Sequence, residues 1–284
     1  TDFKMRKILL TLSMLLLFPL VGHTAACAVS SGVTTITDNA CESQPDSYGI
    51  VMYKMYLCTS APTQPTTTAA ADLTAGGCVL VLDGGSGARI DITGSSKVDF
   101  TGTTFTKPVA GVYTHGYMHI DNIFYVKQQR IFNEAKEGSK SGTDNGIHCS
   151  TLSGTGTDAG ETSTCGASAI TPGIWGSTMT DFDGSEAGIQ ATATRNNLNN
   201  TGSNITGVLI DTNGHQATSA GEVDSLGGFQ LFGTPIVVSK NLKELNVSFG
   251  ITEGSVIFQD GSDPNVVGFS SGPFQAVITA VNHE

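Results

Sequence analysis

Two histidines and an aspartate lie close together in a segment with a strong β pattern. His115, His119 and Asp121 are residue types that bind metal ions. Histidines four positions apart share one face of a helix, but this segment alternates as a strand. A strand rises about 3.3 Å per residue, which puts the two histidines about 13 Å apart. We therefore expect them to line a surface or groove rather than a zinc site.

An acidic turn is the best candidate for a cation site. Ca²⁺ prefers clustered carboxylate oxygens, and Asp181, Asp183 and Glu186 follow one another closely. Their spacing does not fit the EF-hand loop, which needs ligands at alternate positions and a glutamate at the twelfth. Asp, Asn and Gly also form turns without an ion. The sequence thus predicts a calcium site at these three residues, with an ion-free turn as the alternative, and no other cofactor.

One serine matches the pattern of a hydrolase nucleophile. Residues 268–272 read G-F-S-S-G, which fits G-x-S-x-G around Ser270. A nucleophile elbow needs a strand before the serine and a helix after it. Here Pro273 follows almost at once, and then a strand pattern. We expect a turn between two strands, no catalytic residue and no enzymatic activity; a secreted hydrolase is the third hypothesis.

Aromatic side chains alternate with apolar ones between Pro108 and Val126. In an extended chain, alternate residues lie on opposite faces. This pattern places Tyr113, Tyr117 and His119 on one face, where aromatic rings could stack on sugar rings. We predict these three as ligand-binding residues, and packing under a second sheet as the alternative. Gly116 interrupts the apolar face and predicts a bulge or a close approach.

The composition excludes several functional classes. The chain has 284 residues, a net charge of −11 and 14% charged residues, against about 25% in an average domain. Lysine and arginine are sparse and form no basic patch, which excludes nucleic acid as a partner. The 35 glycines, with many serines and threonines, favour turns and short strands over helices.

The N-terminus has the pattern of a secretory signal peptide over residues 5–26. Basic residues precede an apolar run, Ile8 to Val21, which is shorter than the roughly 20 residues of a membrane span. Small residues follow at 24–26. We predict export to the periplasm, the cell surface or the medium, with no transmembrane span in the mature chain. Cleavage after Ala26 would leave Cys27 first, where lipid attachment is an alternative.

Six cysteines in an exported chain predict disulfides. Sequence order gives the simplest of the 15 possible pairings. No C-x-x-C motif is present, and this argues against a zinc-binding or redox-active role for the cysteines. The predicted pairs are Cys27–Cys41, Cys58–Cys78 and Cys149–Cys165.

The strand signals indicate an all-β fold. Residues 27–47 form a polar arm, and residues 48–284 a β-sandwich unit with a loop-rich insertion at about 138–225. Two domains, 48–137 and 138–284, are the alternative. We expect an antiparallel sandwich of immunoglobulin, prealbumin or jelly-roll type. Further predictions are a strand at 48–57, a hairpin from strands 78–82 and 88–93, a short helical segment at 128–137, and strands at 229–239, 245–251 and 274–281.

Pro108 to Tyr113, P-V-A-G-V-Y, resembles the P-x-x-G-x-Y signature of Cna-B-like and related prealbumin-like modules. The resemblance covers six residues. It implies a sandwich module that serves as a stalk or spacer of a bacterial surface protein. Some such modules carry an isopeptide bond, for which Lys54 is a conceivable donor.

The favoured function is a secreted, non-enzymatic structural or adhesive protein, such as a filament subunit. The polar arm would pair with a neighbour's sheet edge by β-strand addition. The predicted partners are therefore a second copy or a cell-surface glycan. The alternative is a secreted carbohydrate- or ligand-binding module.

Overall fold

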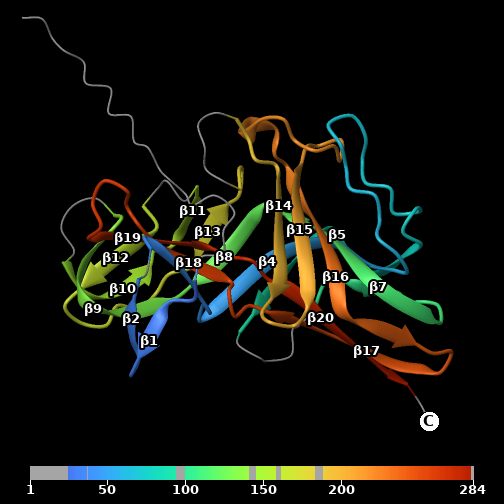
Figure 1. The fold of residues 1–284 in the computed structure, drawn as a ribbon, viewed down its shortest axis with the longest axis horizontal. Helices are drawn as coiled ribbons and strands as arrows, with labels where there is room; N and C mark the ends of the chain where they lie inside the picture. Colours follow the sequence, from blue (N-terminus) through green and yellow to red (C-terminus); the bar gives the residue numbers. More distant parts are fainter. Residues whose placement is uncertain are drawn as a thin grey trace, which may run out of the picture.

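The computed structural model describes residues 25–36, 38–93, 100–140, 145–157, 161–182 and 188–282. Strands make up 61% of the structure, and the described residues contain no α-helix. They include one short 3-10 helix, Ala220–Glu222. No helix in this part of the chain is long and apolar enough to cross a membrane. The all-β prediction is confirmed: the strands form two large sheets and one separate pair (Figure 1).

The larger sheet has ten strands, with β4 near its centre. The sequence of β4, S-Y-G-I-V-M-Y-K-M-Y-L-C, alternates large apolar residues with polar or aromatic ones, which suits a half-buried strand. The strand order is β11 (Gly154–Gly156), β13 (Trp175–Thr178), β8 (Ile123–Lys127), β4 (Ser47–Cys58), β7 (Gly111–Asp121), β16 (Ser225–Val238), β15 (Ser203–Ile210) and β14 (Thr192–Leu198); β5 (Cys78–Ile92) also pairs with β4, and β6 (Thr104–Phe105) pairs with β5.

A pair of strands, β17 (Leu242–Gly250) and β20 (Gln275–Asn282), covers the inner face of this sheet. The main core lies between them. Met55 and Ile120 from the sheet and Phe249 and Phe274 from the cover are each at most 6% exposed. Full burial of one such side chain stabilises the fold by about 1.5–3 kcal/mol relative to exposure. This face-to-face packing confirms the sandwich arrangement in its general form.

The second large sheet has eight strands and takes them from distant parts of the chain. The chain just before β1 lies along β3, because Cys27 N–H donates to the Glu42 carbonyl at 2.8 Å. The two ends of the strand order therefore approach each other and curl around a second core that contains Phe132 and Phe269. The order is β1 (Ala28–Ser30), β2 (Val33–Thr35), β9 (Gln129–Gly138), β19 (Val266–Ser271), β18 (Ser255–Gln259) and β3 (Ala40–Ser43), with β10 (Asn145–Thr151) on β9 and β12 (Ser163–Gly166) on β10.

Three disulfides pair the cysteines in sequence order, as predicted. The pairs are Cys27–Cys41, Cys58–Cys78 and Cys149–Cys165. Each links residues 14 to 20 positions apart, a loop size worth about 3 kcal/mol in the chain-entropy model. Cys149 and Cys165 lie directly opposite each other on β10 and β12, and both belong to the second core.

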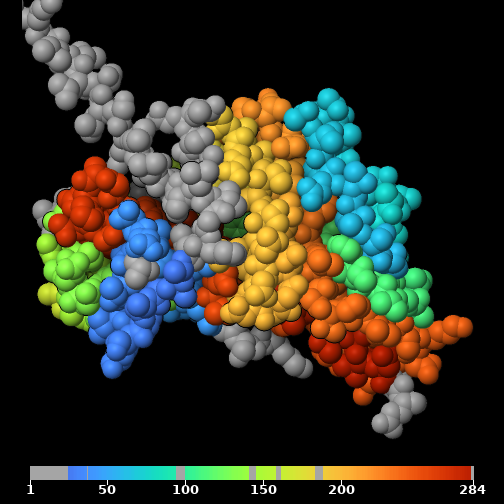
Figure 2. All heavy atoms as spheres, viewed as in Figure 1, coloured from blue at the N-terminus to red at the C-terminus, as the bar shows by residue number. Residues whose placement is uncertain are grey.

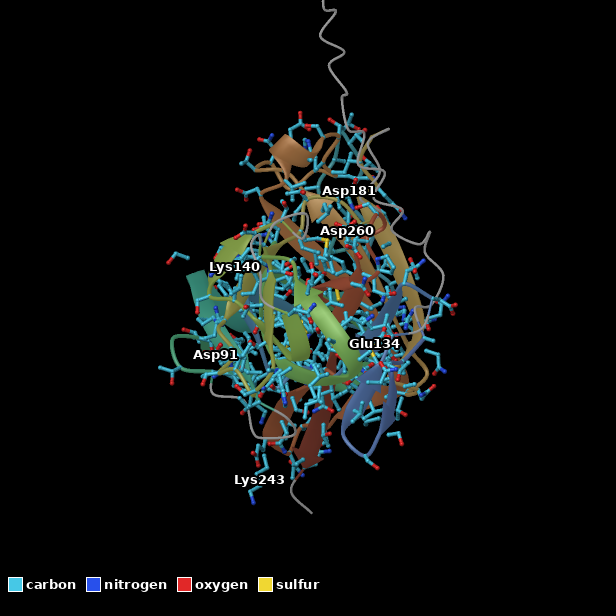
Figure 3. The ribbon with its side chains drawn as sticks, turned by 90° about the vertical axis from the view of Figure 1, so that its left-hand side faces the viewer. Asp91, Glu134, Lys140, Asp181, Lys243 and Asp260 are labelled. Atoms are coloured by element: carbon cyan, nitrogen blue, oxygen red, sulfur yellow. A yellow bond between two sulfur atoms is a disulfide. The ribbon has the colours of Figure 1, made fainter. Side chains whose placement is uncertain are left out.

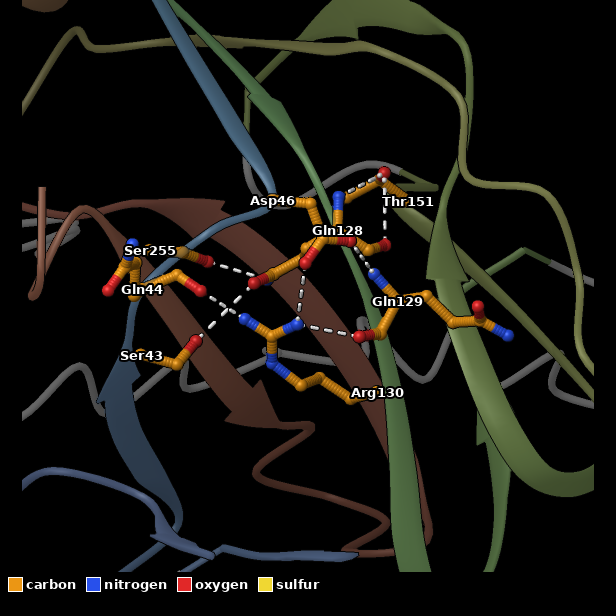
Figure 4. A network of polar contacts seen from close by, with 8 residues as sticks. All are labelled: Ser43, Gln44, Asp46, Gln128, Gln129, Arg130, Thr151 and Ser255. Atoms are coloured by element: carbon orange, nitrogen blue, oxygen red, sulfur yellow. Dashed lines mark hydrogen bonds and ion pairs between the residues drawn. The ribbon is translucent and has the colours of Figure 1, made fainter. Parts of the chain in front are cut away.

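The chain passes from one large sheet to the other at Gln128, between β8 and β9. Its side chain is fully buried and donates to Ser255 Oγ at 2.5 Å and accepts from Ser43 Oγ at 3.3 Å. The Arg130 guanidinium next to it donates to Asp46 Oδ1 at 3.2 Å and to the Gln44 carbonyl (Figure 4). These contacts fix the two connecting segments, residues 44–46 and Gln128, to strands β3, β9 and β18 of the eight-stranded sheet. The charged side chains of Asp91, Lys140 and Lys243 are exposed and point outward (Figure 3).

Two predicted elements are wrong. Residues 78–82 and 88–93 do not form a hairpin: both halves lie in β5 and pair with β4. The glycine-rich turn between them is a bulge, in which Gly85 and Gly87 adopt positive φ angles of 60° and 118°. Residues 128–137 form no helix either. Instead, the backbone of β9 pairs with β10 on one side and with β2 on the other, and Phe132 is buried. Tertiary pairing overrides its local propensity.

The polar arm, 27–47, packs on its own chain. β2 pairs with β9 and β3 pairs with β18, and the Cys27–Cys41 disulfide joins the arm's two ends. Only β1 keeps an open side, since it pairs with β2 alone among the described strands. The arm is thus not a free strand, although one of its edges is open.

Candidate functional site

The predicted ligand-binding tyrosines do not share a face. Tyr113 is fully buried in the main core, and Tyr117 is 7% exposed on the opposite side of the sheet, beside Tyr56 and Phe229. The register between β7 and β16 shifts between these two tyrosines, which breaks the expected alternation. The two rings therefore offer no common stacking surface. Burial raises the pKa of Tyr117 to about 12.

Gly116 is the close-approach point that the sequence predicted. A side chain there would meet Phe232, whose ring Cζ lies 2.8 Å from the position of a Cβ. The Phe232 ring fills the space that the missing side chain leaves. Gly116 thus allows β16 to turn a phenylalanine inward where the register shifts.

His119, the third predicted ligand-binding residue, lies half-buried on the outer face of β7. Its Nε2 is 3.0 Å from Ser225 Oγ, and its ring contacts that of Tyr53. Burial, and then the charge of Lys54, lower the pKa of His119, so its imidazole is neutral near pH 7. Ser225 is only 2% exposed. The serine–histidine contact therefore has the geometry of a nucleophile and base without access for a substrate.

The predicted calcium residues are only partly described. Asp183 and Glu186 lie outside the described residues, while Asp181 Oδ1 accepts a hydrogen bond from Gln190 N–H at 2.8 Å. Among the described residues, no group of three or more His, Cys, Asp or Glu side chains is placed to hold a metal ion. The calcium site stays a prediction.

Ser270 lies in a strand, not in the predicted turn. It belongs to β19, is 7% exposed, and donates from Oγ to the carbonyl of Ser271 at 3.1 Å. No helix follows it: residues after Pro273 enter β20. The G-x-S-x-G match therefore lacks the strand-to-helix turn that a nucleophile elbow needs.

The Tyr113 hydroxyl explains the local pattern at the start of β7. It donates to the Val109 carbonyl at 2.8 Å, and its ring packs over Gly111. The proline and glycine of the P-x-x-G-x-Y segment thus form a short turn that the tyrosine closes. Lys54 is exposed and lies on the ladder opposite Asp83 and His119.

An open groove runs along one side of the sandwich, between β16 and β20. It has a volume of about 520 Å³. The Gln230 amide closes one end, since it donates to the Ala276 carbonyl at 2.8 Å and accepts from Ala276 N–H at 3.0 Å. At the other end Asn282 Oδ1 accepts from Ser239 Oγ at 2.8 Å. β16 and β20 therefore run in the same direction, and the groove lies between the Gln230–Ala276 and Ser239–Asn282 hydrogen bonds.

Backbone groups of β20 point into this groove. N–H and C=O of one strand residue point to the same side, and the side alternates along the strand. Because the groups of Ala276 face Gln230, those of Ile278 and Ala280 face the groove as well. β20 pairs only with β17 among the described strands, so these groups have no ladder partner there.

The β16 side of the groove is open for a similar reason. β15 pairs with β16 only as far as Leu231, so residues 236–238 pair with β7 on one side and with no described strand on the other. Val237 and Val277 flank the groove and are 58% and 42% exposed. None of the described lining residues is charged. The sequence did not indicate this groove, because it depends on where β15 ends relative to β16.

Searches against protein-family models, curated proteins and solved structures found no match for this chain. Its function must therefore be argued from its own geometry.

Proposed function

We propose that this chain is an exported, non-enzymatic structural or adhesive protein whose copies join by β-strand addition in the β16/β20 groove. The groove carries the proposal, since it presents two unpaired strand edges side by side. An added strand would pair with the backbone groups of Ile278 and Ala280. Charged side chains, prolines and bulges protect exposed strand edges. No described lining residue of the groove is charged, and Pro235 and the register shift of β16 lie on the β16 side, so β20 is the edge that we expect to accept the added strand.

The occupant we propose is β1 of a second copy. All three residues of β1 are exposed, and Val29 is 63% exposed. A tight turn at Ser31 and Gly32, with φ angles of 50° and 80°, fixes β1 as the outer strand of a hairpin. Residues 25–36 contain no charged side chain. An uncharged edge would therefore enter an uncharged groove.

The positions of the two edges favour an open chain of copies. β1 and the β16/β20 groove lie toward opposite ends of the long axis (Figure 1). A contact between two different surfaces is heterologous, and it forms filaments when the rotation does not close a ring. From the sequence, the whole N-terminal arm is expected to join a neighbouring copy by β-strand addition. In the proposed arrangement only the open edge of β1 does so. It also agrees with the stalk role that the P-x-x-G-x-Y resemblance implies.

Two lysine substitutions test the proposal in the exported, disulfide-bonded protein. We expect the unsubstituted protein to form concentration-dependent chains in sedimentation and electron microscopy. Val29→Lys blocks the donor edge and Val277→Lys blocks the groove, so each variant alone should be monomeric. Their equal mixture should stop at the dimer, because only one intact interface remains.

Ile174→Lys is the matched control. Ile174 is 48% exposed and lies outside both surfaces, so its lysine variant should assemble like the unsubstituted protein. A protein that stays monomeric at high concentration would refute the proposal. So would a Val29→Lys or Val277→Lys variant that assembles normally.

A further inference from the structure

A second cavity, partly open to solvent, lies on the inner face of the ten-stranded sheet. Its volume is about 260 Å³. An engineered cavity of roughly 150 Å³ binds benzene, so this one has room for about ten non-hydrogen atoms. Its walls are mainly apolar side chains of β7, β8, β15 and β16 and of the loop before β20, among them Met118, Phe124 and Phe274. Figure 2 shows the atoms of β14 and β15, in yellow, in the middle of one face of the molecule.

The cavity exists because two glycines lie side by side in the sheet. Gly207 on β15 pairs directly with Gly228 on β16, and both line the cavity. Neighbouring inward positions carry large side chains, such as Ile205 and Leu226. Glycine weakens a strand interior, and in a strand it often marks a place where a ligand or another group approaches closely. Two in register remove the side chains that would otherwise fill the core.

The two glycines differ in what lies over them. A Cβ on Gly207 would be 2.8 Å from the ring of Phe182, which therefore covers that position. A Cβ on Gly228 would have its nearest neighbours at 3.8 Å, Met118 Cε, and at 3.9 Å, Ile205 Cδ1. These are ordinary contact distances. The free space of the cavity therefore begins at Gly228.

The charged groups at the cavity select against an anion. Arg195 and Glu42 line it. The Arg195 guanidinium donates to Glu42 Oε2 at 2.5 Å and to Glu253 Oε2 at 2.9 Å. The two glutamates thus already occupy the Nε and Nη2 groups of Arg195, on a chain that is itself acidic. A carboxylate or phosphate would meet repulsion there.

We propose that this cavity is a binding site for a small apolar molecule that carries no negative charge. The ligand places a linear or aromatic hydrocarbon body over Gly228, between Met118 and Phe274. Its neutral or cationic end lies toward Arg195 and the two glutamates. Pockets for small molecules have this composition: apolar walls and a few polar groups that fix orientation. The site is separate from the β16/β20 groove and does not depend on assembly.

Calorimetric titration of the full, exported chain with three eight-carbon probes tests the proposal. 1-Octanol, octylamine and octanoate have the same hydrocarbon body and differ in charge. We expect 1-octanol and octylamine to bind with one molecule per chain, and octanoate to bind at least about tenfold more weakly. Equal binding of all three, or tighter binding of octanoate, would overturn the proposal.

Gly228→Val fills the cavity from its open position. We expect it to weaken 1-octanol binding at least about tenfold while its melting temperature stays equal to or above that of the unsubstituted protein. Gly228→Ala gives a smaller loss and serves if the valine variant fails to fold. Gly111→Val is the matched control, because its Cβ would also have its nearest neighbour at 3.8 Å, in Tyr113, away from the cavity. Binding that both Gly228 variants leave unchanged would refute the site.

Discussion

Removal of the Arg195 guanidinium should destabilise the junction between the two large sheets. Arg195 lies on β14, and its partners Glu42 and Glu253 lie on β3 and in the loop before β18. The side chains are 19%, 6% and 19% exposed, respectively. Arg195→Met keeps much of the apolar volume but leaves one buried carboxylate, Glu42, and one partly buried carboxylate, Glu253, without this cation. Such a change costs about 3–5 kcal/mol, and partial exposure leads us to expect about 3 kcal/mol.

Urea unfolding, followed by circular dichroism, measures this loss at pH 7. The triple variant Arg195→Met/Glu42→Gln/Glu253→Gln carries no uncompensated charge and should recover most of the stability.

The exposed pair Arg89–Asp91 provides the control for this series. Its side chains are 34% and 60% exposed, so Arg89→Met should cost less than about 1 kcal/mol, as exposed pairs do. An Arg195→Met loss of the same small size would refute the reasoning. A triple variant no more stable than the single one would refute it as well.

Three further predictions concern other buried groups. Tyr117 has its pKa raised from 10.0 to about 12, so the unfolded state ionises first as pH rises. This tyrosine should contribute about 1.4 kcal/mol to the stability lost between pH 8 and 11 in rapid denaturation assays, and the loss for Tyr117→Phe should be smaller by that amount. Gln230→Leu leaves the N–H and C=O of Ala276 unpaired and should lower the free energy of unfolding in urea by about 2–5 kcal/mol. A loss below about 1 kcal/mol would show that the Gln230–Ala276 hydrogen bonds do not stabilise the fold. Replacement of Cys58 and Cys78 by alanine should cost about 3 kcal/mol, and an unchanged unfolding midpoint would contradict it.

The strands that the sequence predicted well are those whose burial depends on their own alternation. β4 and β17 carry apolar residues at regular intervals, and both form close to the predicted bounds. The local sequence of β9 predicts a helix, because Phe132 is its only fully buried apolar residue and no apolar alternation marks it as a strand. It forms a strand because its backbone pairs with β2, β10 and β19. The local sequence does not indicate these partners.

The candidate sites were less predictable than the strands. Strict alternation placed Tyr113 and Tyr117 on one face, but a register shift between them moves one ring into the core and the other to the outer face. Gly207 and Gly228 are two of 35 glycines, and only the pairing of β15 with β16 sets them side by side. The disulfides were predictable because each closes a short local loop.

The strand order of the eight-stranded sheet constrains the order of events during biosynthesis. β3 pairs with β18, although the two come from opposite ends of the chain. Pairing between such distant segments is slow, and β3 cannot pair with β18 until residues 255–259 have been made. Cys27 and Cys41 can bond earlier, since their loop is short. A chain interrupted before residue 255 would leave Cys41 and Phe132 without the cover of Ile257 and Phe269, exposed to aggregation and proteolysis.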